Sequence, residues 1–174
     1  MYKDFELKRS RVFEEVLLIK PDVFEDHRGA LFTDYLKSFY NEEVGNELSF
    51  DHSKYAHNRK DVLRGIHGDF ESWKLVSCVY GEIFQVVVDN RKDSSTYLKY
   101  DCFELDYRNP LLILMPPGFG NAFYVKSDFA VYNYKLSYVG NYNDCDEQFT
   151  MKWNDPKLNI PWPTNNPILS GRDK

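Results

Sequence analysis

The chain has 174 residues, a length typical of one domain, and we predict a single domain spanning residues 1–174. Hydrophobic residues make up 43% of the chain and aromatic residues 17%, which supplies enough apolar area to exclude intrinsic disorder for most of it. The formal net charge of −5 disfavours a general nucleic-acid binder, because polyphosphate is repelled at long range, but it leaves room for a local phosphate pocket.

Location and redox state follow from two further features. No apolar run approaches the roughly 20 residues that span a bilayer, and the start MYKDFELKRS lacks the apolar stretch of a secretory signal. We therefore expect a soluble cytoplasmic protein without a membrane partner. The cysteines, Cys78, Cys102 and Cys145, are far apart and form no CxxC pair, so we expect reduced thiols, two of them packed in strands.

Short runs of β-branched and aromatic residues recur along the chain, separated by turns rich in Gly, Pro, Asn and Asp. In chain order, the predicted strands cover residues 14–19, 30–35, 48–56, 73–80, 81–89, 98–105, 111–115, 121–125 and 130–138. Apolar residues occupy both faces of 81–89, which predicts a strand buried on both sides. Only residues 36–45 show a helical pattern, with Gly45 as its stop, and they predict a short surface helix.

The tail from Trp153 has prolines at positions 156, 161, 163 and 167, which forbid a regular ladder and favour an extended segment laid over the strands. Many short strands at this spacing favour a sandwich or barrel, since paired or closed sheets hide their edges. The predicted fold is an all-β jelly roll.

The segment VLRGIHGDFESWKLV (62–76) brings Arg64, His67 and Lys74 close together in a chain with 4 histidines. An imidazole can take a proton near neutral pH, and the two cations can hold phosphate or a developing oxyanion. From spacing alone, an ordinary half-buried histidine between solvated cations is the better-supported interpretation.

Alternation along 131–138 places Tyr134 and Tyr138 on one strand face and Lys135 on the other. Phenols there can pack, stack on a base or donate a proton, and the high aromatic content of the chain favours packing. Asp155 precedes a proline in the turn WNDP and must be extended; alone, this pattern predicts only an Asx turn.

Taken together, several segments resemble the nucleotide-sugar 3,5-epimerase family, in the order that the family has them. They are DHRGALF (26–32), VLRGIHGDFESWKLV (62–76), MPPGFGNAF (115–123), YK (134–135), WNDPKLNIPWP (153–163) and ILSGRDK (168–174). The combination of LRG-(Leu/Ile)-His with a later WNDP and WP is far more specific than any piece alone. The best-known members act on dTDP-4-dehydro-6-deoxyglucose in rhamnose biosynthesis. The resemblance implies a cupin-type jelly roll (a double-stranded β-helix), which agrees with the strand pattern, and a homodimer.

The resemblance also implies a mechanism, the inversion of C3, C5 or both in a nucleotide-diphosphate 4-keto-6-deoxy sugar through an enolate. The C4 ketone acidifies the hydrogens on both neighbouring carbons. His67 is the implied base, and Lys74 is expected to stabilise the O4 oxyanion. Asp155 is expected to hydrogen-bond the far nitrogen of the imidazole. Tyr134 is expected to deliver a proton from the opposite face.

Substrate contacts and cofactors are implied in the same way. Arg64 and Arg28 are expected to grip the diphosphate, and Asn121, Lys135 and Tyr138 complete the expected contacts. Many cupins bind a metal through an HxH motif and a later histidine. This chain lacks both, so we expect no metal and no organic cofactor.

The chain departs from the family pattern at positions that contact nucleotide or sugar. It reads GFGNAF where most members read GFAHGF, so Asn121 stands in place of a pocket histidine and cannot act as an acid or base near pH 7. Leu31 and Thr33 stand where a phenylalanine and a glutamate are usual, and KYAHN (54–58) replaces an NxSxS stretch. These departures favour a non-thymidine nucleotide such as GDP, carrying a 4-keto-6-deoxy hexose or heptose. The resemblance to family members in capsule and surface-polysaccharide pathways implies capsule or O-antigen synthesis, and by the same analogy a downstream reductase acts on the product.

Two alternatives stay open. One is a 3,4-ketoisomerase on the same scaffold, which Tyr134 and the WNDP turn disfavour. The other is a catalytically silent sugar-binding cupin, since fold does not dictate function; the joint presence of base, acid and oxyanion cation argues against it. The sequence leaves the choice between C3, C5 and both undecided.

Overall fold

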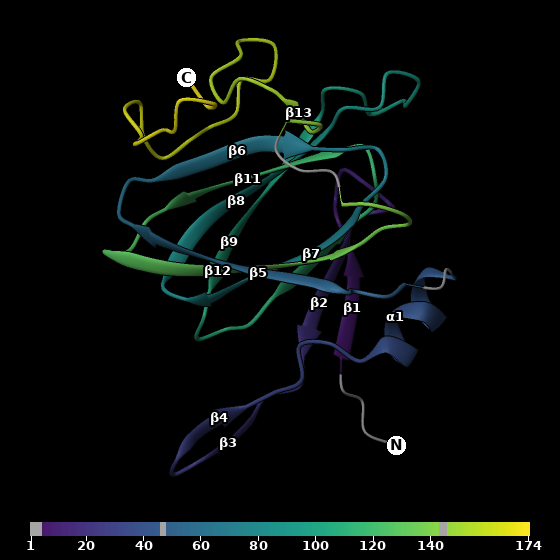
Figure 1. Cartoon of the computed structure of the whole chain (residues 1–174). Coiled ribbons are helices and arrows are strands. Elements are labelled where there is room, and N and C mark those ends of the chain that lie inside the picture. Colours follow the sequence, from purple (N-terminus) through teal and green to yellow (C-terminus); the bar gives the residue numbers. More distant parts are fainter. Residues whose placement is uncertain (1–4, 46–47, 143–145) are drawn as a thin grey trace.

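The computed structural model describes residues 5–45, 48–142 and 146–174, and nearly all of its regular structure is antiparallel strand (Figure 1). One sheet has six strands, in the order β1 (Phe5–Arg9), β2 (Leu17–Pro21), β10 (Leu112–Met115), β7 (Trp73–Tyr80), β12 (Phe129–Ser137), β5 (His52–Arg59). The second has five, in the order β13 (Phe149–Thr150), β6 (Leu63–Gly68), β11 (Phe119–Val125), β8 (Glu82–Asp89), β9 (Tyr100–Asp106). A small hairpin joins β3 (Phe24–Asp26) to β4 (Gly29–Leu31), and the helix α1 spans Lys37–Val44.

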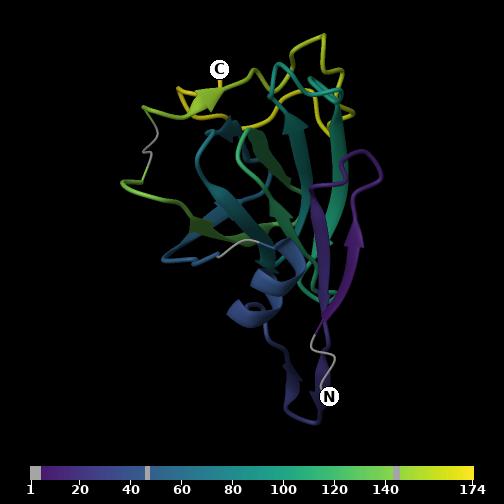
Figure 2. The same ribbon diagram turned by 90° about the vertical axis from the view of Figure 1, so that its right-hand side faces the viewer.

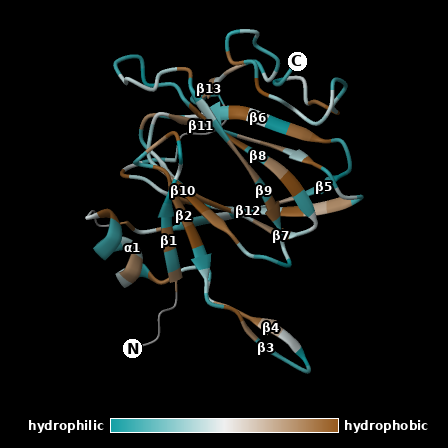
Figure 3. Cartoon of the chain, turned by 180° about the vertical axis from the view of Figure 1, so that it is seen from behind, coloured by the Kyte–Doolittle hydropathy of each residue, from teal (hydrophilic) through white to brown (hydrophobic). Residues whose placement is uncertain are grey.

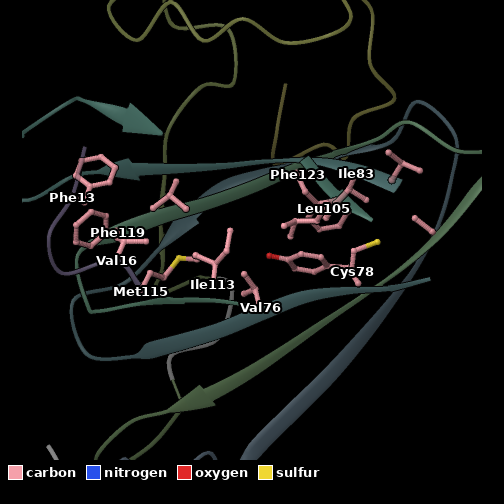
Figure 4. Close-up of a cluster of buried hydrophobic side chains, with 14 residues drawn as sticks. Phe13, Val16, Val76, Cys78, Ile83, Leu105, Ile113, Met115, Phe119 and Phe123 are labelled. Atoms are coloured by element: carbon pink, nitrogen blue, oxygen red, sulfur yellow. The ribbon is translucent and has the colours of Figure 1, made fainter. Parts of the chain in front are cut away.

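The two large sheets face each other across a shared apolar core (Figures 1 and 4). Val76 and Ile113 enter this core from the six-stranded sheet, while Ile83, Val87 and Phe119 enter it from the five-stranded sheet. The predicted all-β jelly roll is therefore confirmed. Close packing of side chains from both sheets excludes water and holds the sheets at a fixed separation.

Each of the nine predicted strands overlaps a strand of the structure, and 73–80 coincides with β7. The predicted helix is also confirmed, since α1 ends at Val44 and is followed by Gly45, which adopts the left-handed conformation with φ +69°. The strand predicted over 30–35 is wrong in extent, because only its first residues pair, in the β3–β4 hairpin. β5 likewise starts later than predicted and runs on to Arg59.

Strand β8 is buried on both sides, as predicted, because each of its faces meets a separate apolar cluster. Val87 packs into the core between the sheets, and Val86 packs on the outer side with Leu158 and Trp162 of the C-terminal segment. That segment (yellow) lies across the end of the sheets that is opposite the β3–β4 hairpin (Figures 1 and 2). The tail therefore covers the sheets without regular pairing, as its prolines indicate.

Strand β6 escaped prediction because its sequence LRGIHG contains two glycines, which weaken a strand pattern. Both are required by the close approach of β11. A Cβ on Gly65, which has φ +115°, would lie 2.5 Å from the Cβ of Ala122, and one on Gly68 would lie 2.4 Å from the carbonyl oxygen of Phe119. The glycines thus let β6 lie against β11 and place His67 directly opposite Asn121.

Cys78 in β7 and Cys102 in β9 are free thiols in strands, as expected. Burial raises the pKa of each to about 12, so neither is a reactive thiolate at neutral pH. Cys145 lies outside the described residues. Within the described part of the chain, no helix has the length and apolar character to cross a bilayer.

Candidate active site

A cavity of about 320 Å³ lies between the two sheets and is closed on one side by the C-terminal segment. β5, β7 and β12 supply one wall, β6 and β11 supply the other, and Ser170, Arg172 and Asp173 come from the tail. Two of the three residues singled out in 62–76, Arg64 and His67, lie on β6, and the third, Lys74, lies on β7 in the facing sheet.

His67 forms a close pair with Asp173, the penultimate residue of the chain. Its Nε2 lies 2.5 Å from Asp173 Oδ1, and the other carboxylate oxygen accepts a hydrogen bond of 2.8 Å from Ser170 Oγ. Burial alone would raise the pKa of Asp173, but the hydrogen bonds from His67 and Ser170 lower it below its ordinary value. Asp173 is therefore ionised at neutral pH and favours the tautomer with the proton on Nε2, in which Nδ1 of the imidazole is the nitrogen that can accept a proton.

The expected partner of His67 was Asp155, and the structure gives that place to Asp173. The Oδ1 of Asp155 instead accepts the backbone N–H of Lys157 at 2.9 Å, and its own carbonyl caps the turn that follows. Asp155 lines a separate surface cavity with Trp153 and Trp162. The Asx turn that the WNDP pattern predicts by itself is thus what the structure contains. Asp173 lies in the segment ILSGRDK, which carried part of the resemblance but was given no role.

Lys74 presents an ammonium group to the cavity from β7, and its side chain is 8% exposed. Its Nζ lies 3.1 Å from Asp69 Oδ2, while Asp69 Oδ1 accepts the backbone N–H groups of Glu71 and Ser72. Burial lowers the pKa of Lys74, and the Asp69 charge partly restores it. Burial alone would raise the pKa of Asp69. The Lys74 charge and the backbone hydrogen bonds outweigh burial, so the pKa lies below its ordinary value. Asp69 is therefore ionised beside Lys74, and it is a site residue that the sequence pattern did not reveal.

The cavity is basic in a chain of negative net charge. Four of its fifteen lining residues are lysine or arginine, and Asp173 is the one carboxylate among these described residues. The Nε of Arg64 donates to Asn58 Oδ1 at 2.7 Å, and the Nε of Arg172 donates to Thr150 Oγ1 at 2.9 Å, so both guanidinium groups are held in place. Fixed guanidinium groups in a basic cavity suit a diphosphate.

Tyr134 lines the cavity from β12, on the wall that faces His67. Burial raises the pKa of its phenol, and the nearby Lys54 offsets part of this effect. The group is therefore protonated at neutral pH and can donate. Lys54 also lines the cavity, and it comes from the KYAHN stretch that departs from the family pattern.

Three expected substrate contacts lie elsewhere. Lys135 is on the opposite face of β12, where it pairs with Asp34 and donates to Asn133 Oδ1 at 2.9 Å. The ring centroid of Tyr138 lies 5.6 Å from that of Tyr142, and Tyr138 does not line the cavity. Arg28 is on the β3–β4 hairpin, which projects from the sheets (Figure 1); there it pairs with Asp26 and does not line this cavity. Strand alternation explains Lys135, because neighbouring residues point to opposite faces.

Asn121 lines the cavity from β11, as expected of a substrate contact. Among the described residues, no group of three or more His, Cys, Asp or Glu side chains is arranged to hold a metal ion.

Comparison with known proteins identifies the family. The family model described as dTDP-4-dehydrorhamnose 3,5-epimerase matches residues 11–174. The chain belongs to this family. A dTDP-4-dehydrorhamnose 3,5-epimerase of Shigella flexneri is 36% identical over 162 residues, which cover 91% of this chain and 88% of that protein. A dTDP-4-dehydrorhamnose 3-epimerase of Streptomyces niveus is 34% identical over 92% of this chain and 78% of its own length.

A solved structure supports the same family assignment. The dTDP-6-deoxy-D-glucose-3,5-epimerase of Legionella pneumophila, in complex with dTDP-4-keto-L-rhamnose, superposes with a TM-score of 0.90 at 30% identity, covering 97% of this chain and 89% of that one. The fold is thus that of the family's cupin-like epimerases, and the protein is an isomerase that epimerises a nucleotide sugar.

Exchange of Asp173 for asparagine tests which carboxylate serves His67. We expect Asp173→Asn to lower kcat by about 100- to 10,000-fold, because the amide no longer holds the imidazole in its basic tautomer. Asp155→Asn is the matched control and should stay close to wild type. Steady-state epimerisation rates and melting temperatures of both variants decide; a larger loss in Asp155→Asn would reverse the assignment.

Asp69→Asn tests the ion pair at Lys74. A cationic role for Lys74 means that activity is lost as the pH rises through its pKa. Removing Asp69 removes the charge that raises this pKa, and the alkaline limb of the kcat profile should therefore move to lower pH. Ser72→Ala, which keeps its backbone N–H to Asp69, is the control. An alkaline limb unmoved in Asp69→Asn would show that Asp69 does not tune Lys74.

Proposed function

We propose that this protein inverts C3, C5 or both in a nucleotide-diphosphate 4-keto-6-deoxy sugar, with no metal or organic cofactor. The observation that supports this most directly is the joint placement of His67–Asp173, Lys74 and Tyr134 around one basic cavity. The His67 Nδ1 takes the proton from the carbon beside the ketone, and the electron pair moves into an enolate whose oxygen lies against the Lys74 ammonium. Tyr134 then returns a proton to that carbon.

The opposite placement of base and acid is what inversion requires. His67 belongs to the five-stranded sheet and Tyr134 to the six-stranded sheet, so the two groups come from facing walls of the cavity. A planar enolate between them can lose a proton to one wall and gain one from the other. The same arrangement disfavours a ketoisomerase, which moves the carbonyl rather than inverting a centre.

The nucleotide we propose is dTDP, which the names of the relatives carry. A GDP-linked hexose or heptose is the competing substrate, and the departures at Asn121, Lys54 and the β3–β4 hairpin favour it. The same hypothesis predicts a role in capsule or O-antigen synthesis, a reductase that consumes the product, and a cytoplasmic location. Lys54, Arg64 and Arg172 are the proposed diphosphate ligands.

Incubation with dTDP- and GDP-linked 4-keto-6-deoxy sugars in deuterated water tests the proposal. We expect deuterium at C3, C5 or both, read by mass gain and proton NMR, and faster exchange with one nucleotide. His67→Ala should lower exchange by about 100- to 10,000-fold, because the base is lost. Tyr134→Phe should keep exchange and lose net inversion, because deuterons then return only from the His67 side. No exchange with any sugar, or migration of the carbonyl, would refute the epimerase proposal.

We also propose a homodimer in which the β3–β4 hairpin is covered by a second chain. The hairpin projects from the body (Figures 1 and 2) and carries hydrophobic segments (Figure 3). Phe24 is 67% exposed and Leu31 is 73% exposed, although an isolated two-stranded hairpin is only marginally stable in water. Burial against a partner would order the hairpin, and it would bring Arg28 to the partner's surface.

Light scattering of the purified protein checks this. We expect the mass of a dimer for the wild type and a shift toward monomer for Leu31→Asp, because a carboxylate is then buried at the interface. Val139→Asp, at a residue 94% exposed, is the control and should leave the mass unchanged. A monomeric wild type would rule the dimer out.

A further inference from the structure

The cavity wall contains a polar network of three side chains that the mechanism above does not use. Gln85 of β8 is fully buried and points between the sheets, on the strand face that carries Ile83 and Val87. Tyr132 of β12 is 1% exposed and donates toward Gln85 Oε1 at 2.9 Å. The third member is Asn121, which reaches from the network to the cavity.

Hydrogen bonds dictate how the Asn121 amide is oriented. The Nε2 of Gln85 donates to the backbone carbonyl of Val86 at 3.1 Å, so this atom is the amide nitrogen of Gln85. The same Nε2 donates at 2.6 Å to Asn121, whose facing atom must therefore be the acceptor Oδ1. The Tyr132 hydroxyl lies 3.0 Å from the same Oδ1. With its oxygen engaged from behind, Asn121 turns its Nδ2 donor toward the cavity.

The Asn121 amide lies next to His67, the proposed base. Asn121 and His67 are directly paired across β11 and β6, and both side chains line the cavity, so they are neighbours on one sheet face. The described residues offer the Asn121 Nδ2 no hydrogen-bond partner. A donor held in a fixed direction on this half-buried side chain favours a ligand that offers an acceptor oxygen over one that lacks it.

We infer that Asn121 Nδ2 is a fixed hydrogen-bond donor to a sugar oxygen beside the carbon that His67 deprotonates, and that Gln85 and Tyr132 are positioning residues that hold it. The inference rests on the proposed function and adds a specificity-determining contact to it. The network is neutral, because burial raises the pKa of Tyr132 well above its ordinary value and amides do not titrate. This wall therefore selects a ligand by hydrogen bonding, without supplying a second base.

Two variants remove the donor in different ways. Asn121→Asp keeps an acceptor for Gln85 and Tyr132 but presents a second acceptor to the ligand, while Asn121→Leu removes the donor without adding charge. We expect both to lower kcat/KM by about 10- to 100-fold, the usual effect of losing a hydrogen-bond donor to a ligand oxygen. Wild-type kcat/KM in either variant would overturn the inference.

A double-mutant cycle tests the positioning role. Gln85→Met should lower kcat/KM by itself and have no further effect in the Asn121→Leu background, because Gln85 acts only through Asn121. Ile83→Ala, on the same buried face of β8 but paired with Val125 and outside the cavity lining, is the control for lost packing; it should lower the melting temperature and leave kcat/KM unchanged. Additive effects of Gln85→Met and Asn121→Leu would contradict the role of Gln85 as a positioning residue for Asn121.

A binding measurement separates this inference from the proposed function. In ¹⁵N-labelled protein, dTDP-glucose or GDP-glucose should shift the side-chain amide signal of Asn121 and leave that of Gln85 nearly in place. If the wild-type protein epimerises none of the sugars, the proposed function fails, and the Asn121 shift alone then decides the inference. No shift with either nucleotide sugar would overturn it.

Discussion

The hydrogen bond between His67 and Asp173 ties the end of the chain to strand β6, and the geometry of the site depends on it. Val62, just before β6, forms a parallel bridge with Ile168 of the tail. Five residues further along both segments, His67 meets Asp173. The backbone bonds of Ile168 to Asp61 and Leu63 fix the tail at the start of β6, and a turn follows in which the Asp173 N–H donates to the Ser170 carbonyl. An irregular, proline-rich segment can place a carboxylate beside His67 because its backbone is paired just before that carboxylate.

Charge is concentrated in the cavity at a cost that specific contacts offset. A buried ammonium or carboxylate loses several kcal/mol of solvation unless it is paired. Lys74 and Asp69 meet this cost together, with two backbone N–H groups on the carboxylate. Asp173 meets it through His67 and Ser170. Arg64 and Arg172 each donate from Nε to a neutral oxygen, which fixes one edge of the guanidinium group. The result is a preorganised basic site, which suits an anionic ligand and an enolate more than any neutral molecule.

Much of the fold follows from the sequence, because short β-branched and aromatic runs between turn residues leave few alternatives to stacked sheets. Strand β6 shows why the sequence pattern did not predict every strand. Its glycines weaken the strand pattern, yet they are what allows β11 to approach and what positions His67. A local pattern cannot show a requirement that a distant strand imposes.

The site was predictable where one segment carried several of its groups, as with Arg64, His67 and Lys74. It was not predictable where the partner is remote in sequence. The carboxylate beside His67 comes from the final residues, and a local Asx turn takes the place expected of Asp155. Asp69 was overlooked although it lies close to Lys74 in sequence, since only the fold shows that the two side chains meet. Gln85 likewise reads as one polar residue in an apolar strand until the Asn121 contact is seen.

The central claim is that the cavity between the sheets, with His67–Asp173 at its wall, is where the nucleotide sugar binds. A crystal structure of the protein with dTDP or GDP bound tests it most directly. We predict a diphosphate contacted by Arg64 and Arg172, with the sugar-side phosphate directed toward His67 and Lys74. A nucleotide bound outside this cavity, or an Asp173 carboxylate turned away from His67, would contradict the account.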